Sequence, residues 1–234
     1  MKKNKLSTGV GVALDPAQGG HKYLIDQHLR DRYTIFFADM TRFNLSPFPV
    51  PNPYLAPLPI ELVTREYDLI ILDGHQLRNQ NDAGGLLAIS QIIIALMTTK
   101  PAGSTIVMKL SNSEIAETAR IMFALDMLSS SLVAFKPYLM HREKATFYAV
   151  ARGVGGGIER QGYLVHYLQH FQALWEILMS RPNQQSLLRH DLDFIATDEE
   201  LASYAPRMDL LCGEVRARQR DALKSRFEAL HNPL

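Results

Sequence analysis

The chain has 234 residues, a formal net charge of +1 and 47% hydrophobic residues. This composition indicates a soluble globular protein with one large domain or one domain and an appendage, and it argues against a protein that binds polyanions mainly by electrostatic attraction. The single cysteine, Cys212, excludes an internal disulfide framework and a cysteine-rich zinc site. The apolar runs are too short or too interrupted to span a bilayer, and Met1–Lys5 lead into Leu-Ser-Thr-Gly, so we expect no membrane association and a cytoplasmic or nuclear location.

The first predicted element is a short strand of small residues, Thr8–Leu14, which Asp15-Pro16 ends. Its Gly-x-Gly is a poor dinucleotide-binding fingerprint, because Leu14 stands at the third glycine position and the pair lies inside the strand. A helix is predicted from Gly19 to about Arg30. The next β-rich run, Tyr33–Asp39, closes on an acid.

Asp39 is a candidate for hydrogen bonding to the polar edge of a ligand at the rim of the sheet, and an Asx turn before Met40 is the structural alternative. The proline-rich segment Asn44–Pro59 predicts an extended surface loop. The aromatic residues in and beside this segment are suited to stacking on a base, although packing back onto the domain is the more common outcome for such side chains. They are Phe43, Phe48 and Tyr54.

The central prediction concerns a strand, a helix and a second strand between residues 67 and 109. Tyr67–Asp73 is a continuous apolar run closed by a carboxylate, which is typical of a central parallel strand covered on both faces. Leu86–Thr99 predicts a largely buried helix, and Ser104–Lys109 predicts a β-branched strand that ends in a lysine. A right-handed parallel crossover would bring Asp73 and Lys109 to the same edge of the sheet, where open α/β sheets bind ligands. The structural alternative is that Asp73 caps a loop and Lys109 extends into solvent.

The remaining segments complete the sheet and then become helical. A helix is predicted to start at Ser111 as N-cap with Glu114 in a capping box, followed by a strand and by an antiparallel strand near residues 145–151. Gly153–Gly157 predicts a hinge between a domain at residues 1–153 and a helical extension at residues 158–234. The extension is predicted to contain helices at residues 163–179, from Thr197, and at 208–230. The last carries Arg216, Arg218, Arg220, Lys224 and Arg226, which we interpret as a charged surface face, with contact to an RNA backbone as the alternative.

Four segments in order resemble the FtsJ-like (RrmJ-like) methyltransferases, including viral cap methyltransferases and fungal relatives, which methylate ribose 2′-hydroxyls. They are Tyr33–Asp39, Leu69–Gly74, Lys100–Leu110, and Lys136-Pro137 with Phe147–Gly153. The resemblance covers roughly residues 9–153 and implies a Rossmann-like methyltransferase sheet, mostly parallel with an antiparallel last strand, that lacks its first strand and carries a C-terminal helical extension. It implies S-adenosylmethionine as cofactor, with Asp39, Asp73 and Gly74 as binding residues and Asp73 and Lys109 as catalytic residues.

The chain departs from this family in two ways. No strand and glycine-rich turn for the methionine half of the cofactor precede the element that Gly9–Leu14 resembles. The family has a catalytic Lys-Asp-Lys-Glu tetrad, of which only the second and third members, Asp73 and Lys109, can be carried over. The first lysine of the tetrad lies further upstream in the family. The fourth position falls on Thr146, and Glu143 is nearby but out of register.

Three hypotheses about function follow. The favoured one is an S-adenosylmethionine-dependent enzyme that methylates an RNA ribose, with its missing strand supplied by another chain or absent from an incomplete gene product. The second is a catalytically degenerate methyltransferase fold that binds RNA or protein, with the C-terminal helices as a surface for a protein partner. The third is an unrelated nucleotide-binding α/β enzyme, which the poor Gly-x-Gly disfavours. The methyl-transfer mechanism implies no metal, and the eight histidines show no ligand spacing.

Overall fold

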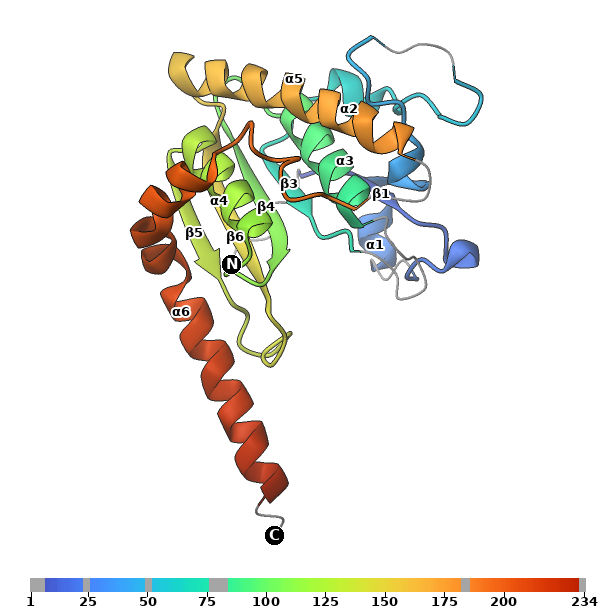
Figure 1. Cartoon of the computed structure of the whole chain (residues 1–234). Helices are drawn as coiled ribbons and strands as arrows, with labels where there is room; N and C mark the ends of the chain where they lie inside the picture. The colour runs from blue at the N-terminus through green and yellow to red at the C-terminus, as the bar shows by residue number, and fades with distance from the viewer. Residues whose placement is uncertain (1–6, 23–25, 49–51, 76–83, 182–185, 232–234) are drawn as a thin grey trace.

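The computed structural model describes residues 7–22, 26–48, 52–75, 84–181 and 186–231 of an α/β protein with two separate β-sheets. The smaller sheet pairs β1 (Gly9–Ala13) with β2 (Tyr33–Phe37) in parallel. The larger sheet has the order β3-β4-β6-β5 and contains both parallel and antiparallel pairs. Figure 1 shows the two sheets and the helices around them.

In the larger sheet, β3 (Leu69–Leu72) runs parallel to β4 (Ser104–Ser111). The long strand β6 (Thr146–Val154) lies between β4 and β5 (Ser131–Phe135) and is antiparallel to both. The antiparallel strand predicted near residues 145–151 is therefore confirmed, and it occupies an inner position while β5 forms the outer edge.

The helices account for the rest of the described secondary structure. The short ones are η1 (Pro16–Gln18), α1 (Gln27–Arg30), η2 (Met40–Arg42) and α2 (Glu61–Thr64). The long ones are α3 (Gly84–Met97), α4 (Ala116–Leu128), α5 (Ile158–Ser180) and α6 (Asp198–His231). The C-terminal half of α6 projects away from the body of the molecule (Figure 1).

One hydrophobic core joins the sheet to the helices. Helix α3 is apolar around most of its circumference because it packs against the sheet on one side and α5 on the other, and Ile89 and Ile93 have no exposed surface. The same cluster of buried residues includes Leu178 of α5 and Cys212 of α6. The hinge predicted at Gly153–Gly157 lies between the last residues of β6 and the start of α5. The residues before and after it contribute to the same hydrophobic core.

The Gly-x-Gly of β1 has a packing role. A Cβ atom on Gly9 would lie 2.4 Å from the Tyr33 ring, and one on Gly11 would lie 2.8 Å from the Ile35 side chain. Both glycines therefore leave room for side chains of β2. Their spacing of two residues matches the alternation of side chains along a strand.

Four predicted features differ from the structure. The helix predicted from Gly19 is wrong over Gly19–Lys22, because Gly19 adopts a left-handed conformation at the end of η1; α1 starts at Gln27, and Tyr23–Ile25 lie outside the described residues. Ser111 is not an N-cap, because it pairs with Thr146 as the last residue of β4, and α4 starts at Ala116. The two C-terminal helices are one helix, α6, which continues through Pro206.

The fourth difference concerns β3, which was expected to be covered on both faces. Leu69 is 53% exposed and Ile71 is 61% exposed, whereas Leu72 is buried. Among the described residues, β3 pairs only with β4 and no strand lies on its other side. A sequence suited to a central strand therefore lies at a sheet edge.

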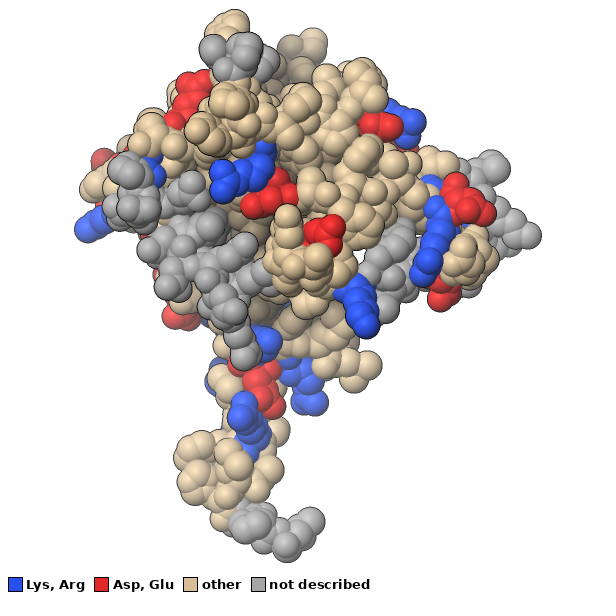
Figure 2. Space-filling model, turned by 90° about the vertical axis from the view of Figure 1, so that its right-hand side faces the viewer, with Lys and Arg blue, Asp and Glu red and all other residues tan. Residues whose placement is uncertain are grey.

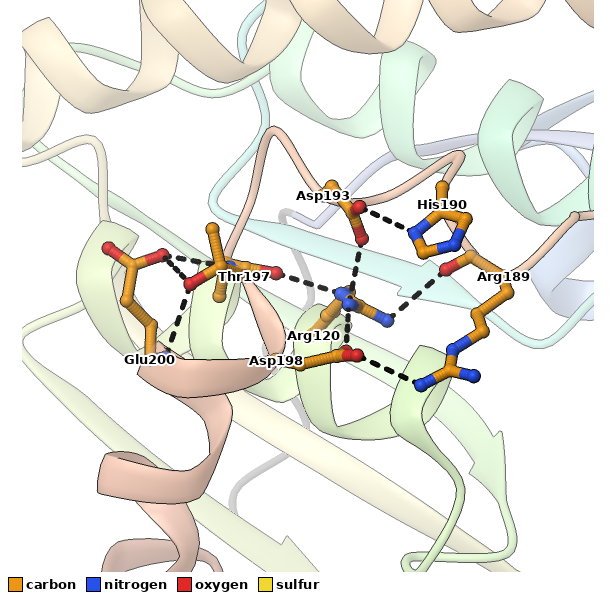
Figure 3. Close-up of polar contacts among 8 residues, drawn as sticks. Arg120, Arg189, His190, Asp193, Thr197, Asp198 and Glu200 are labelled. Atoms are coloured by element: carbon orange, nitrogen blue, oxygen red, sulfur yellow. Dashed lines mark hydrogen bonds and ion pairs between the residues drawn. The ribbon is translucent and has the colours of Figure 1, made fainter.

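A buried arginine ties α4 to the segment before α6 (Figure 3). The Arg120 side chain is fully buried and donates to the carbonyl oxygen of Ala196 at 2.8 Å. Its Nη2 lies 2.8 Å from Asp193 and 2.7 Å from Asp198. A helix was predicted to start at Thr197, and a capping box is present there, since Thr197 and Glu200 exchange side-chain to backbone hydrogen bonds at the start of α6.

Candidate active site

Asp73 and Lys109 lie together at the carboxyl ends of two neighbouring parallel strands. Asp73 directly follows β3, and Lys109 lies near the end of β4. The Lys109 Nζ atom is 2.9 Å from Oδ1 of Asp73 and donates to the Asp73 carbonyl oxygen, also at 2.9 Å. The lysine side chain is 13% exposed and the carboxylate is 56% exposed. A nearly buried amine is thus held by an acid that remains open to solvent.

Two further side chains join this pair. Tyr148 lies opposite Lys109 in the β4–β6 ladder, and its hydroxyl donates to Oδ1 of Asp73 at 3.2 Å. Nδ1 of His75 lies 3.1 Å from the Lys109 Nζ atom. The sequence prediction missed both residues. The strict alternation of β6 and its register against β4 would have placed Tyr148 beside Lys109, but that register is fixed only by the folded sheet.

Burial affects the acid-base behaviour of Tyr148. Desolvation raises the pKa of the Tyr148 hydroxyl, and the neighbouring Asp73 carboxylate raises it further. The hydroxyl therefore stays protonated near neutral pH and serves as a hydrogen-bond donor to Asp73.

Gly74 is fixed by a side chain of α3. The Gln91 Oε1 atom accepts from the backbone N–H of Gly74 at 2.9 Å, and Gln91 Nε2 donates to the Gly74 carbonyl at 3.3 Å. A Cβ atom on Gly74 would lie 2.7 Å from Gln91 Oε1, so the contact favours glycine. This arrangement holds the backbone after Asp73 against the helix.

A hollow of about 760 Å³ opens between the two sheets. It is lined by residues of β1 and β3 along their lengths, by α3 below them, and by Asp39, Asp73 and Gly74 at one end. The three residues predicted to bind a cofactor therefore line one cavity. Lys109 lies outside the lining and reaches the cavity through its contact with Asp73.

Asp39 also has a local role, which was the structural alternative in the sequence prediction. Its Oδ1 atom accepts from the backbone N–H of Thr41 at 3.0 Å and from the Thr41 hydroxyl at 2.7 Å, which caps η2. One carboxylate oxygen is thus engaged in the turn.

The lysine that precedes Pro137 closes the loop between β5 and β6. Lys136 is 2% exposed and donates to the carbonyl oxygens of Lys144 and Thr146. Burial lowers the pKa of the Lys136 amine. Thr146, which the resemblance places at the fourth tetrad position, supplies a carbonyl to Lys136 and pairs with Ser111.

The basic residues of α6 are paired with acids. Each lies against a carboxylate: Arg216 with Asp209, Arg218 with Glu214, Arg220 with Asp221, Lys224 with Glu228 and Arg226 with Glu143. Figure 2 shows positive and negative side chains interspersed on the face that it presents, including the projecting part of α6. This pairing favours the interpretation of a charged surface face over that of an RNA-binding stripe.

The described part of the chain contains neither a metal-binding cluster nor a membrane-spanning helix. No set of three or more histidine, cysteine, aspartate or glutamate residues there is grouped so as to hold a metal ion. No helix in that part combines the length and apolarity needed to cross a membrane.

Comparisons with known proteins do not identify a family. No family model and no curated protein matches the chain. A solved structure titled "Alphavirus P23pro-zbd" is similar at 14% identity with a TM-score of 0.35. The match covers 78% of this chain and 25% of the alphavirus chain, so this chain spans about a quarter of that protein's length.

Proposed function

We propose that the protein is an S-adenosylmethionine-dependent methyltransferase that acts on a ribose 2′-hydroxyl of RNA, through a site built on Asp73 and Lys109. The observation that carries the proposal is the ion pair between these residues at the rim of a hollow that Asp39 and Gly74 also line. The FtsJ-like resemblance rests on the ends of the same strands.

The order of the strands supports the same proposal. If β1 and β2 correspond to the second and third strands of a doubly wound sheet, and β3 and β4 to the fourth and fifth, the spatial order is 3-2-gap-4-5. The common dinucleotide-binding order is 3-2-1-4-5-6, in which ligands bind at the carboxyl ends next to the first strand. The hollow lies where that first strand would be.

The site residues suit methyl transfer from a sulfonium. In that reaction the new carbon–oxygen bond forms as the carbon–sulfur bond breaks, and the hydroxyl loses its proton, so donor and acceptor must be aligned. Lys109, the ammonium of the ion pair with Asp73, would position the hydroxyl oxygen and stabilise the negative charge that develops on it, and the proton would leave to solvent water. Asp73 holds Lys109, and Tyr148 and Gln91 hold Asp73 and the adjoining backbone.

The test measures cofactor binding and transfer separately. We expect calorimetry to detect S-adenosylmethionine binding, and transfer of its labelled methyl group to RNA to give an alkali-resistant linkage, because a 2′-O-methyl group blocks attack on the neighbouring phosphate. DNA of the same sequence, which lacks the 2′-hydroxyl, should accept no label. Absence of heat at millimolar S-adenosylmethionine would refute the proposal.

Two lysine variants distinguish loss of the proposed catalytic amine from a general effect of removing a paired lysine. Lys109→Met should abolish transfer while cofactor affinity changes only a few-fold. The matched control is Lys100→Met, because Lys100 pairs with Asp68 at the opposite ends of β3 and β4. Unchanged turnover in Lys109→Met would rule out its catalytic role.

A catalytically degenerate fold that binds RNA or protein is the second candidate, and one observation favours it. Among the described residues, the polar groups that contact Lys109 are Asp73 and His75, and no glutamate is present there. If the protein binds RNA in a filter assay but transfers no methyl group at saturating cofactor, the degenerate function is the correct one.

A further inference from the structure

We propose that one face of the larger sheet binds single-stranded RNA beside the site at Asp73 and Lys109, with a nucleobase stacked on Phe135 and a backbone phosphate on Arg152. The inference rests on the proposed function, because it assigns the side of Lys109 from which the acceptor ribose would approach. The register of three neighbouring strands carries it.

The two faces of the larger sheet differ in their surroundings. On one face, the side chains of β6 have no exposed surface and pack in the core beneath α4 (Figure 1); they are Phe147, Ala149 and Ala151. Side chains alternate along a strand, so Tyr148, Val150 and Arg152 lie on the other face. We call this second face the Tyr148 face.

A row of side chains on the Tyr148 face ends at the site. Tyr148 is paired with Lys109 of β4 on one side and with Phe135 of β5 on the other. Paired residues place their side chains on the same face, and neighbouring strands are about 4.8 Å apart, so Phe135 lies roughly 10 Å from Lys109 across the sheet. The Phe135 side chain is 45% exposed. It therefore offers an open aromatic surface within reach of a nucleotide whose ribose lies at Lys109.

An aromatic surface at this position suits a nucleobase. The bases of single-stranded RNA stack on aromatic rings, because every base has a π face, whereas the bases of a duplex are covered by their neighbours. Val133 and Val150 form the next pair along the strands and continue the surface as an apolar floor toward Arg152. The surface that begins at Lys109 thus extends along β6.

Arg152 supplies a positive charge at the far end of this surface. Its side chain is exposed, and within the part of the chain that the structure describes no acid forms an ion pair with it. The basic residues of α6 differ, because each of them lies against a carboxylate. Arg152 lies four residues beyond Tyr148, which is about 13 Å along the strand. A cation without an acidic partner is suited to a backbone phosphate.

The proposed cofactor site lies on the other side of Lys109. The hollow is lined by β1 and β3 with Asp39, Asp73 and Gly74, and its lining includes neither Phe135 nor Arg152. In the sheet, β4 lies between β3 and β6. Lys109 therefore stands between a surface for the methyl donor and a surface for the acceptor, which is the alignment that an in-line transfer requires.

The first test uses the 234-residue protein without cofactor and a fluorescein-labelled oligouridylate of about 12 nucleotides, followed by fluorescence anisotropy. We expect the oligouridylate to bind. A blunt RNA duplex of the same length should bind at least about fivefold more weakly, because its bases cannot stack on Phe135. Equal affinity for the two RNAs, or no binding of the oligouridylate, would overturn the proposal.

Variants of Phe135 distinguish stacking from apolar contact. Phe135→Leu keeps an apolar side chain and removes the π face, so it should weaken binding of the oligouridylate at least about fivefold, whereas Phe135→Trp should retain it. The matched control is Phe227→Leu, because Phe227 is 63% exposed on α6, and it should leave the affinity unchanged. Wild-type affinity in Phe135→Leu would contradict stacking on this residue.

The salt dependence of binding tests Arg152. In Arg152→Gln the slope of the logarithm of the association constant against the logarithm of salt concentration should become less negative by roughly 0.7, the value for one phosphate of a single strand. Arg220→Gln is the control, because Arg220 is 76% exposed and lies against Asp221, and its slope should equal that of the wild type. An unchanged slope in Arg152→Gln would show that no phosphate lies on Arg152.

A second copy of the chain is the alternative occupant of the Tyr148 face, because Val133 and Phe135 expose apolar surface that a protein could cover. Sedimentation of the protein alone decides between the two. A wild-type mass that rises with concentration, together with a Phe135→Leu variant that stays monomeric, would assign the face to contact between two copies and would overturn RNA binding there.

This inference and the proposed function fail in different ways. RNA binding that depends on Phe135, without methyl transfer at saturating S-adenosylmethionine, would leave the Tyr148 face as an RNA-binding surface and count against the methyltransferase. Methyl transfer with an unchanged KM for RNA in Phe135→Leu would leave the enzyme in place and refute the Tyr148 face as its acceptor surface.

Discussion

The Tyr148 hydroxyl donates a hydrogen bond of 3.2 Å to the Asp73 carboxylate, although the two residues are 75 positions apart in the chain. Tyr148 faces Lys109 across the β4–β6 ladder, so one antiparallel strand completes a site that otherwise consists of two parallel strand ends. Burial keeps the Tyr148 hydroxyl protonated, so it can orient the Asp73 carboxylate, and Asp73 in turn holds Lys109.

This contact predicts the behaviour of Tyr148→Phe. The substitution keeps the ring and removes the donor, so kcat for methyl transfer should fall about threefold to tenfold, which corresponds to roughly 1 kcal/mol. Affinity for S-adenosylmethionine should stay the same, and the free energy of unfolding should change by less than about 1 kcal/mol because Asp73 is half exposed. A stopped assay with varied cofactor concentration measures both constants, and an unaltered kcat would show that Asp73 needs no such support.

The buried Arg120 network predicts a loss of stability. Arg120→Leu leaves the Ala196 carbonyl without its donor and removes one of the cationic partners of Asp193 and of Asp198 (Figure 3), which should lower the free energy of unfolding by about 1–3 kcal/mol. Arg189→Ala is the control, because Arg189 is 75% exposed and contacts the same Asp198, and it should cost less than about 1 kcal/mol. Urea unfolding measures both, and similar costs would contradict a structural role for the buried guanidinium.

Arg218 of α6 contacts the loop that follows β5. Its guanidinium donates to the Lys136 carbonyl at 2.8 Å and to the Tyr138 hydroxyl at 2.7 Å, and lies 4.0 Å from the centre of the Tyr138 ring. Arg218→Ala should therefore raise amide exchange across residues 137–145 several-fold. Arg220→Ala, which removes a contact with the adjacent Asp221, should leave exchange there unchanged. Exchange measured by mass spectrometry distinguishes the two, and equal rates in both variants would show that α6 does not hold the loop.

Buried tyrosines predict a loss of stability at alkaline pH. Burial, with smaller contributions from Tyr163 and Glu200, raises the pKa of Tyr167 to about 12. The unfolded chain releases this proton near pH 10 while the folded chain keeps it, so the stabilisation is complete below about pH 10 and is lost as the pH rises toward about 12.

The expected slope is at most about 1.4 kcal/mol per pH unit from this residue. Urea unfolding between about pH 9 and pH 11 should show the decline, and Tyr167→Phe should reduce it. Tyr54→Phe is the control, because Tyr54 is 78% exposed. A slope that Tyr167→Phe leaves unchanged would assign the alkaline loss to other groups, of which Tyr204 is one, since burial also raises its pKa.

The sequence predicted most strands because local patterns specify them. The β-branched runs around Ile35, Ile70, Val107 and Val133 all lie in strands, and the crossover rule placed Asp73 and Lys109 at one edge. Boundaries that depend on tertiary pairing were less accurate. Ser111 has the sequence signature of an N-cap, but pairing with Thr146 draws it into β4.

The sequence by itself determined that a carboxylate and an amine end two neighbouring parallel strands, because apolar runs, breakers and the handedness of the crossover are all local properties. Only the tertiary structure decided that Tyr148 joins them, that the arginines of α6 are neutralised by acids, and that β1 and β3 flank a hollow. These facts depend on which edges and faces of distant segments meet, and Leu69 and Ile71 show the consequence: residues with the pattern of a sheet interior are exposed because no described strand lies beside them.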